Sequence, residues 1–353
     1  MNSNERPLPH RGAGSNPTNR FEKIELERDV DWNPEDDPAP RTQFYRDNTS
    51  TIINYNDSPD IGFEASINPY RGCEHGCIYC FARPFHEYLG FSSGLDFETK
   101  IMVKDRAPEL LRHELASPKW KPQVIALSGV TDCYQPVERR MKLTRRCLEV
   151  LAEFRNPVGI VTKNHLVTRD IDVLSELARH QAVAVFVSLT TLDTKLRQVM
   201  EPRTSPPASR LAAIRELSQA GIPTGVMTAP VIPGLTDHEL PSLIAAAVEA
   251  GARFAGHVPL RLPYAVAPLF EQWLADHFPD RKEKVLNRIR AMRGGKLNDP
   301  QFGSRMIGQG IFGEQIEALF NVACRKAGIE KNRLGLSTAS FRRVDKNQMS
   351  LFD

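Results

Sequence analysis

Between Phe63 and His257 the sequence alternates short apolar runs with longer amphipathic stretches, and this alternation limits the fold more than any other feature. Short apolar runs predict buried strands, and apolar residues spaced three and four apart predict helices. The predicted strands are Phe63–Asn68, Val124–Ser128, Val158–Thr162, Val183–Ser188, Thr224–Ala229 and Arg253–His257. The predicted helices are Pro108–Leu115, Val137–Phe154, Val167–Arg179, Ser209–Ala220 and His238–Ala250. Such alternation implies parallel strands joined by right-handed crossovers, so the predicted fold class is α/β.

Residues typical of helix caps support this assignment. Ser209 is predicted to cap the start of its helix, and Gly221 follows the end of the same helix. Gly251 follows the end of the helix that finishes at Ala250. The six strand–helix units suggest a (β/α)6 partial TIM barrel, but the pattern alone also permits a doubly wound sheet.

The composition changes at both ends of the alternating region. Residues 1–45 are rich in Pro, Asn, Arg and Asp without apolar periodicity, which predicts a disordered or loosely packed N-terminal arm. Residues 46–258 are the predicted barrel. Residues 259–353 are predicted to form a mainly helical C-terminal extension that closes one side of the barrel, with helices at Ala265–His277, Arg281–Met292 and Ile316–Ala327.

The overall charge and hydrophobicity place few limits on function. With 46 Lys and Arg against 43 Asp and Glu, the net charge is +3, which neither requires nor excludes a polyanionic partner. No apolar run approaches the roughly 18 residues of a membrane span, and the N-terminus lacks the apolar core of a signal peptide. We therefore expect a cytoplasmic protein without a membrane partner, in which cysteines stay reduced.

Three cysteines, Cys73, Cys77 and Cys80, follow the first predicted strand with the spacing C-x3-C-x2-C. Three thiolates on one tight loop can bind three irons of a cubane iron–sulfur cluster and leave the fourth iron open. Buried packing and a zinc site with His75 or a distant cysteine as fourth ligand are the alternatives, but structural zinc usually takes two separated ligand pairs. The other cysteines, Cys133, Cys147 and Cys324, show no clustered spacing, which predicts a single cluster.

The cysteine motif, with an aromatic residue before its last cysteine, resembles the signature of the radical SAM superfamily. The surrounding segments Asn68-Pro-Tyr70-Arg-Gly-Cys73 and Ser128-Gly-Val-Thr-Asp132-Cys-Tyr-Gln-Pro-Val-Glu138 resemble its spore photoproduct lyase-like branch, whose members are often labelled DNA repair photolyases. The resemblance extends from about Phe63 to Val258 and favours the partial barrel over the doubly wound sheet.

The resemblance also implies a set of cofactors and a reaction. One 4Fe–4S cluster would bind S-adenosyl-L-methionine and cleave it reductively to methionine and a 5′-deoxyadenosyl radical, with the electron supplied by a donor such as a flavodoxin or ferredoxin. The implied enzyme is lyase-like and acts in DNA lesion repair or nucleic-acid modification. Two alternatives stay open: radical modification of a peptide, tRNA or small molecule, and a non-enzymatic zinc or nucleic-acid-binding protein.

Polar residues at predicted strand ends are candidates for binding the cofactor. Asp132 suits its ammonium group, Lys163 its carboxylate, and Ser188 its ribose or carboxylate. The resemblance places Tyr79 beside the adenine, and Glu201 and Arg203 among further cofactor contacts. Each of these strand-end residues could instead cap the next helix.

Cys133 and Tyr134 are the candidates on the substrate side, as a hydrogen-atom donor and a radical relay. In spore photoproduct lyase a cysteine near this strand end returns a hydrogen atom to the substrate. The matching position in this sequence is Gly129, so the resemblance predicts radical generation and leaves the repair reaction open.

Two basic runs favour DNA or RNA as a partner, provided that their charges gather on one surface. One lies on the predicted helix 137–154, and the other lies in the C-terminal extension between residues 281 and 296. A solvated helix face is the ordinary alternative for such runs.

Overall fold

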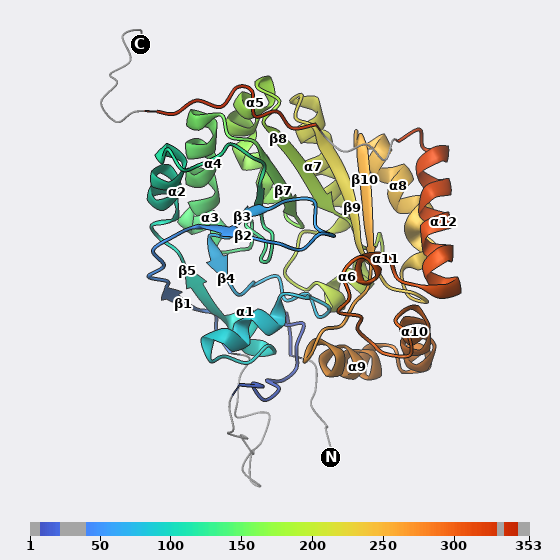
Figure 1. The fold of residues 1–353 in the computed structure, drawn as a ribbon. Helices are drawn as coiled ribbons and strands as arrows, with labels where there is room; N and C mark the ends of the chain where they lie inside the picture. Colours follow the sequence, from blue (N-terminus) through green and yellow to red (C-terminus); the bar gives the residue numbers. More distant parts are fainter. Residues whose placement is uncertain (1–7, 22–39, 330–334, 345–353) are drawn as a thin grey trace.

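A curved sheet of mostly parallel strands forms the centre of the molecule (Figure 1). The computed structural model describes residues 8–21, 40–329 and 335–344. Each neighbouring pair of strands is parallel except β2–β3, which is antiparallel. The spatial order is β10 (Phe254–Pro259), β9 (Thr224–Val231), β8 (Val183–Ser188), β7 (Val158–Thr162), β6 (Ile125–Leu127), β3 (Ala65–Ile67) and β2 (Ile53–Tyr55). The predicted α/β partial barrel is confirmed.

Amphipathic helices cover the outer face of this sheet (Figure 1). In α4, Cys147, Leu148 and Leu151 are fully buried at spacings of three and four residues, which directs one helix face toward the core. Strand residues on the helix-covered face, such as Val158 and Ile160, pack against these helices. The covering helices are α2 (Ala107–Ala116), α4 (Leu143–Phe154), α5 (Ile171–Arg179), α7 (Pro207–Gln219) and α8 (Leu240–Glu249).

Two helix predictions were wrong in detail. The predicted helix 137–154 is divided into α3 (Glu138–Met141) and α4, because Lys142 between them takes a left-handed conformation with φ 53°. Ser209 lies inside α7, which begins at Pro207, a residue whose fixed φ suits a first helical position. The glycines at the helix ends behave as predicted, since Gly221 and Gly251 have φ values of 77° and 106°.

Several short elements were not predicted, because each is too short for a readable periodicity. A three-stranded sheet has the order β1 (Gln43–Arg46), β5 (Lys100–Val103) and β4 (Tyr70–Arg71). The helical segments η1 (Arg83–Leu89), α1 (Leu95–Thr99) and α6 (Thr194–Met200) were also missed. The β4 strand and η1 flank the cysteine motif, so these elements position it.

The C-terminal extension packs on one edge of the sheet (Figure 1). Its helices are α9 (Val266–His277), α10 (Pro279–Met292), α11 (Ser304–Ile307) and α12 (Gly310–Lys326), and α12 contacts α8 and β10. Arg305 of α11 pairs with Asp60 in the β2–β3 loop at 2.6 Å, which links the extension to the opposite edge of the sheet. Within the described ranges, no helix combines the length and apolarity needed to cross a membrane.

Part of the predicted N-terminal arm packs against the body of the protein. Ala13 is 1% exposed, and the Asn19 side chain donates to the Glu87 carbonyl oxygen at 3.0 Å. Residues 1–7 and 22–39 of the arm lie outside the described residues. The domain boundaries after residues 45 and 258 stay predictions.

Candidate active site

The three motif cysteines lie on one loop between β4 and η1. Gly72 and Gly76 turn this loop with φ values of 77° and 67°, which a side chain rarely tolerates. The Cys73 backbone N–H donates to the Phe97 carbonyl at 2.9 Å, and the Cys80 N–H donates to the Cys77 carbonyl at 3.2 Å. The loop is therefore held in place by backbone contacts that do not depend on a bound metal.

A buried ion pair supports the cysteine loop from behind. Arg83 and Glu98 are both 0% exposed and pair at 2.6 Å, and the Arg83 Nε donates to the Cys77 carbonyl at 3.0 Å. Glu98 also accepts from the backbone N–H groups of Gly12 and Ala13 at 3.1 and 2.9 Å. Sequence reasoning missed this pair, because nothing in the local pattern indicates a buried charge at either position.

Replacing Gly12 by Ala is expected to disrupt the packing of residues 8–21 on the cysteine loop. The added Cβ would lie 1.7 Å from the Gly76 carbonyl oxygen, so the backbone must shift. Overpacking of this kind typically costs about 1–3 kcal/mol. Gly14→Ala is the matched control, because nothing lies within 4 Å of its added Cβ. Urea unfolding of the two variants measures the difference, and equal midpoints would contradict the predicted packing.

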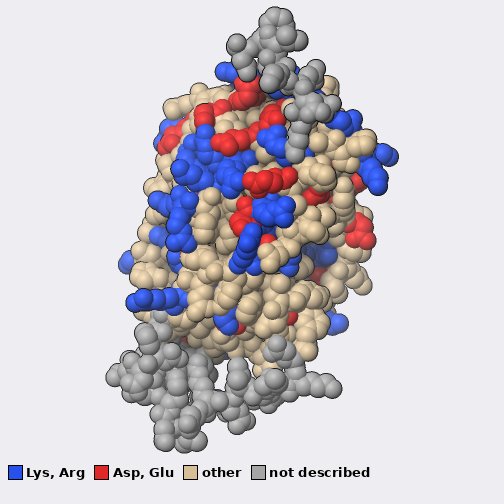
Figure 2. All heavy atoms as spheres, turned by 90° about the vertical axis from the view of Figure 1, so that its left-hand side faces the viewer, with Lys and Arg blue, Asp and Glu red and all other residues tan. Residues whose placement is uncertain are grey.

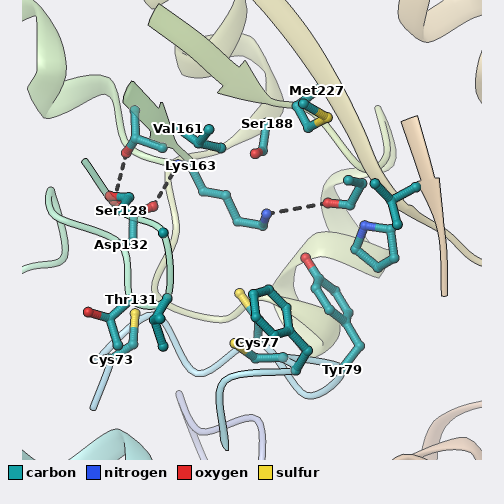
Figure 3. A pocket seen from close by; sticks show the side chains of 18 of the residues that line it. Cys73, Cys77, Tyr79, Ser128, Thr131, Asp132, Val161, Lys163, Ser188 and Met227 are labelled. Atoms are coloured by element: carbon teal, nitrogen blue, oxygen red, sulfur yellow. Dashed lines mark hydrogen bonds between the residues drawn. The ribbon is translucent and has the colours of Figure 1, made fainter. Parts of the chain in front are cut away.

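The cysteine loop forms one wall of a cavity of about 320 Å³. Figure 3 shows Cys73 and Cys77 on one side of this cavity and Ser188 and Met227 on the other, with the Lys163 side chain extending between them. The strand ends of β6, β7, β8 and β9 supply the opposite walls, as expected for a parallel barrel. Cys80 and Tyr79 complete the cysteine side.

Burial raises the pKa of all three thiols, with nearby carboxylates and the other thiols adding to the effect at Cys73. A buried thiolate therefore needs a cation beside it, and iron would supply that charge. Three thiols on one loop facing one cavity fit the donor set of a cluster with one open iron. Among the described residues, no group of three or more His, Cys, Asp or Glu side chains is placed so that it could hold one metal ion.

Asp132 lies on the cavity wall and joins three segments. Its carboxylate accepts from the Thr162 hydroxyl and the Lys163 N–H, both at 2.8 Å, and from the Tyr134 N–H at 2.9 Å, and lies 3.3 Å from His75 Nδ1. Burial by itself raises the pKa of Asp132, but His75 and the backbone donors outweigh it and lower the pKa to about 2. Asp132 thus ties the cysteine loop to the end of β7.

The Lys163 side chain brings a cation into the cavity. Its Nζ lies 3.4 Å from the Ala229 carbonyl oxygen and 5.9 Å from the centre of the Tyr79 ring. A carbonyl neutralises no charge, so the ammonium is available to an anionic ligand. Ser188 directs its hydroxyl toward the same space (Figure 3). Four of the predicted cofactor-binding residues, Tyr79, Asp132, Lys163 and Ser188, therefore line one cavity.

Glu201 and Arg203 lie outside the cavity lining. Glu201 is fully buried behind Tyr79, where it accepts from the Tyr79 hydroxyl, from Arg210 and from the Thr190 hydroxyl. Burial by itself raises the pKa of Glu201, but Arg210 and Lys163 lower it to about 2. Arg203 pairs with Glu74 at 3.0 Å. The geometry indicates that Glu201 positions the Tyr79 ring.

Cys133 and Tyr134 also lie outside the cavity lining. Cys133 is fully buried, and its backbone N–H donates to the Ser128 hydroxyl at 2.7 Å. The Tyr134 hydroxyl donates to Asp170 at 3.0 Å within the core. Ser128, Gly129, Val130 and Thr131 face the cavity from the same segment instead. The roles of Cys133 as hydrogen-atom donor and of Tyr134 as radical relay stay predictions. Their burial outside the cavity argues against both roles.

The basic run of α4 is largely engaged in contacts within the chain. Arg145 pairs with Asp172 at 2.7 Å, and Arg146 pairs with Glu109 at 2.6 Å. Figure 2 shows the face that carries α2 and α4, where basic side chains lie beside acidic ones. In α4 the charges of Arg145 and Arg146 are thus balanced by carboxylates of the chain, which leaves less positive charge there for phosphate binding.

Comparison with known proteins agrees with the architecture and the cysteine loop. The family model for the radical SAM superfamily matches residues 67–247, which cover the loop and most of the barrel. An uncharacterized protein of Mycobacterium tuberculosis strain H37Rv is 40% identical over 245 residues, 69% of this chain and 71% of the relative. The fold and the site thus define a radical SAM enzyme. The chain belongs to the radical SAM superfamily.

More distant relatives show how widely the core sequence is shared. An uncharacterized protein of Methanocaldococcus jannaschii is 29% identical over 178 residues, 50% of this chain and 64% of that protein. Among solved structures, spore photoproduct lyase complexed with dinucleoside spore photoproduct aligns with a TM-score of 0.57 and 16% identity, over 80% of this chain and 78% of that one. At this identity the likeness concerns the fold alone.

Proposed function

We propose that Cys73, Cys77 and Cys80 bind a single 4Fe–4S cluster at which S-adenosylmethionine is reductively cleaved. The observation that carries this proposal is the convergence of three thiols from one loop on a cavity whose opposite wall holds Lys163. When bound, the cluster and S-adenosylmethionine supply a 5′-deoxyadenosyl radical, with an electron from a donor such as a flavodoxin or ferredoxin.

The chain's own residues would bind and orient the cofactor. Lys163 meets its carboxylate as a point charge, and the Ser188 hydroxyl supplies a donor on the opposite wall. Tyr79, held by Glu201, presents its ring to the adenine and restricts its position. Both carboxylate oxygens of Asp132 already accept hydrogen bonds within the chain, so its contribution is to hold the walls together.

We further propose that the substrate is a nucleic acid and that the reaction is lyase-like, in lesion repair or modification. The fold likeness to spore photoproduct lyase with its bound dinucleoside supports this choice. A cysteine hydrogen donor at the position of Gly129 is absent, and Cys133 is turned into the core. The substrate radical would therefore be quenched differently from that of spore photoproduct lyase.

The test is formation of 5′-deoxyadenosine by the anaerobically reconstituted, reduced protein supplied with S-adenosylmethionine. We expect product without substrate at a slow rate, and faster product formation when ultraviolet-irradiated DNA is added than when the same DNA is added unirradiated. Product formation that irradiated DNA does not change would contradict the lesion-repair proposal. No product from protein with a verified cluster, with or without DNA, would contradict the proposed cleavage.

A further inference from the structure

A second cleft of about 280 Å³ adjoins the cavity on the outside of the barrel. It lies between η1, the segment 261–264 after β10 and the segment 298–305 before and in α11. Phe81 and Arg261 line both this outer cleft and the cavity, so the two spaces meet at these residues. Phe81 directly follows the cluster ligand Cys80. A ligand in the outer cleft would thus lie at the entrance to the site of radical chemistry.

The outer cleft is lined by aromatic rings that remain open to solvent. Phe85, Tyr88 and Tyr264 are 52%, 68% and 65% exposed, and Phe81 is 38% exposed. Single exposed rings are common on protein surfaces, but several exposed rings gathered around one cleft mark a binding surface. Guanidinium groups lie over three of these rings, since Arg20 is 3.9 Å from the Tyr264 ring centre and 5.5 Å from that of Tyr88, and Arg261 is 4.9 Å from that of Phe81.

Unlike Arg20 and Arg305 of the same cleft, Arg261 has no ion-pair partner among the described residues. Arg20 pairs with Glu87, and Arg305 pairs with Asp60, both at 2.6 Å. Among the residues that the structure describes, no carboxylate lies within ion-pair distance of Arg261. Burial lowers the pKa of Arg261, which reflects the loss of hydration around its charge.

The carboxylate that lines the outer cleft is already engaged. Asp299 accepts from the Ser304 hydroxyl at 2.6 Å and from the Gln301 N–H at 2.9 Å. Asp60 acts on the charge of Arg261 without an ion-pair contact and is itself paired with Arg305. A partly buried cation without an ion-pair partner gains stability when an anion binds to it. The junction of the two spaces therefore offers a site for one anionic group, with aromatic faces on its outer side.

We propose that the outer cleft binds a single-stranded nucleic acid, with one phosphate at Arg261 and neighbouring bases against the rings of Phe81, Phe85 and Tyr264. This inference rests on the proposed function and specifies its substrate as a strand with unstacked bases. Bases stacked within a duplex cannot offer their faces to protein rings, whereas unpaired bases can. The nucleotide next to the bound phosphate then enters the cavity.

The test measures the fluorescence anisotropy of a labelled strand as the reconstituted protein is added without reductant. The probe is a fluorescein-labelled single-stranded thymidine 12-mer, compared with a duplex, an abasic strand of equal length and a polyglutamate peptide. We expect the single strand to bind at least about tenfold more tightly than each of the others, since base stacking supplies that much. Equal binding of the duplex or abasic strand, or tighter binding of polyglutamate, would overturn it.

The variants Arg261→Gln and Phe85→Ala are each expected to weaken binding of the single strand about tenfold. Tyr55→Ala is the matched control, because Tyr55 is 70% exposed on β2 and does not line the cleft. Iron content and circular dichroism establish that each variant is folded. Variants that bind like the control would overturn the proposal. Because no reductant is present, strand binding is measured independently of S-adenosylmethionine cleavage. The proposed strand binding and the proposed cleavage can therefore be refuted separately.

Discussion

Replacing Cys77 by Ala is expected to remove the iron–sulfur cluster and reduce 5′-deoxyadenosine formation to background. Cys77 is one of three thiols on the cavity wall, and the loop carries no fourth cysteine that could replace it. Two thiolates cannot retain a cluster that normally needs three protein ligands beside its open iron. Iron content should fall from about four per chain toward zero, with loss of the brown absorbance, after identical anaerobic reconstitution.

Cys133→Ala is the matched control for this variant. Cys133 is as deeply buried as the ligands and follows Asp132 of the cavity wall, but it packs in the core of the barrel. This variant should keep its iron and its 5′-deoxyadenosine formation. If Cys77→Ala retained a full complement of iron, or Cys133→Ala lost it, the ligand assignment would be wrong.

Replacing Arg83 by Met is expected to destabilise the protein by about 3–5 kcal/mol, because it leaves the Glu98 carboxylate buried without its cation. The change also removes the donor to the Cys77 carbonyl, so the cysteine loop should release iron faster. Urea unfolding and the rate of iron loss to a chelator measure the two effects.

Two further variants separate the ion pair from general damage. Arg106→Met changes an exposed arginine near the start of α2 and should leave the unfolding midpoint nearly unchanged. The double variant Arg83→Met with Glu98→Leu removes both charges and should recover part of the lost stability, because an apolar pair leaves no buried charge. Recovery would be incomplete, since Glu98 also holds the Gly12 and Ala13 amides. A single variant as stable as the control would refute the role of the pair.

A site residue was placed correctly where the strand or helix that precedes it in the sequence was itself predicted. Lys163 directly follows β7 and Ser188 ends β8. The bounds of both strands were predicted correctly, and both residues line the cavity. Glu201 and Arg203 follow α6, a helix of seven residues that was not predicted. The resemblance placed both residues among the cofactor contacts, whereas Glu201 lies behind Tyr79 and Arg203 pairs with Glu74.

The sequence alone determined the parallel α/β class and the cysteine loop, because both depend on local signals, while the family resemblance favoured the partial barrel over a doubly wound sheet. Periodicity and spacing are properties of neighbouring residues, and burial of the apolar faces then requires strands covered by helices. The tertiary structure decided which side chains meet across long separations. The contact of Gly12 with Gly76, the ion pair of Asp60 with Arg305, and the lack of an ion-pair partner for Arg261 among the described residues result from packing between distant segments. Such long-range contacts produce no periodic pattern in the sequence. Only the folded structure therefore shows which residues support the cysteine loop and which residues form the outer cleft.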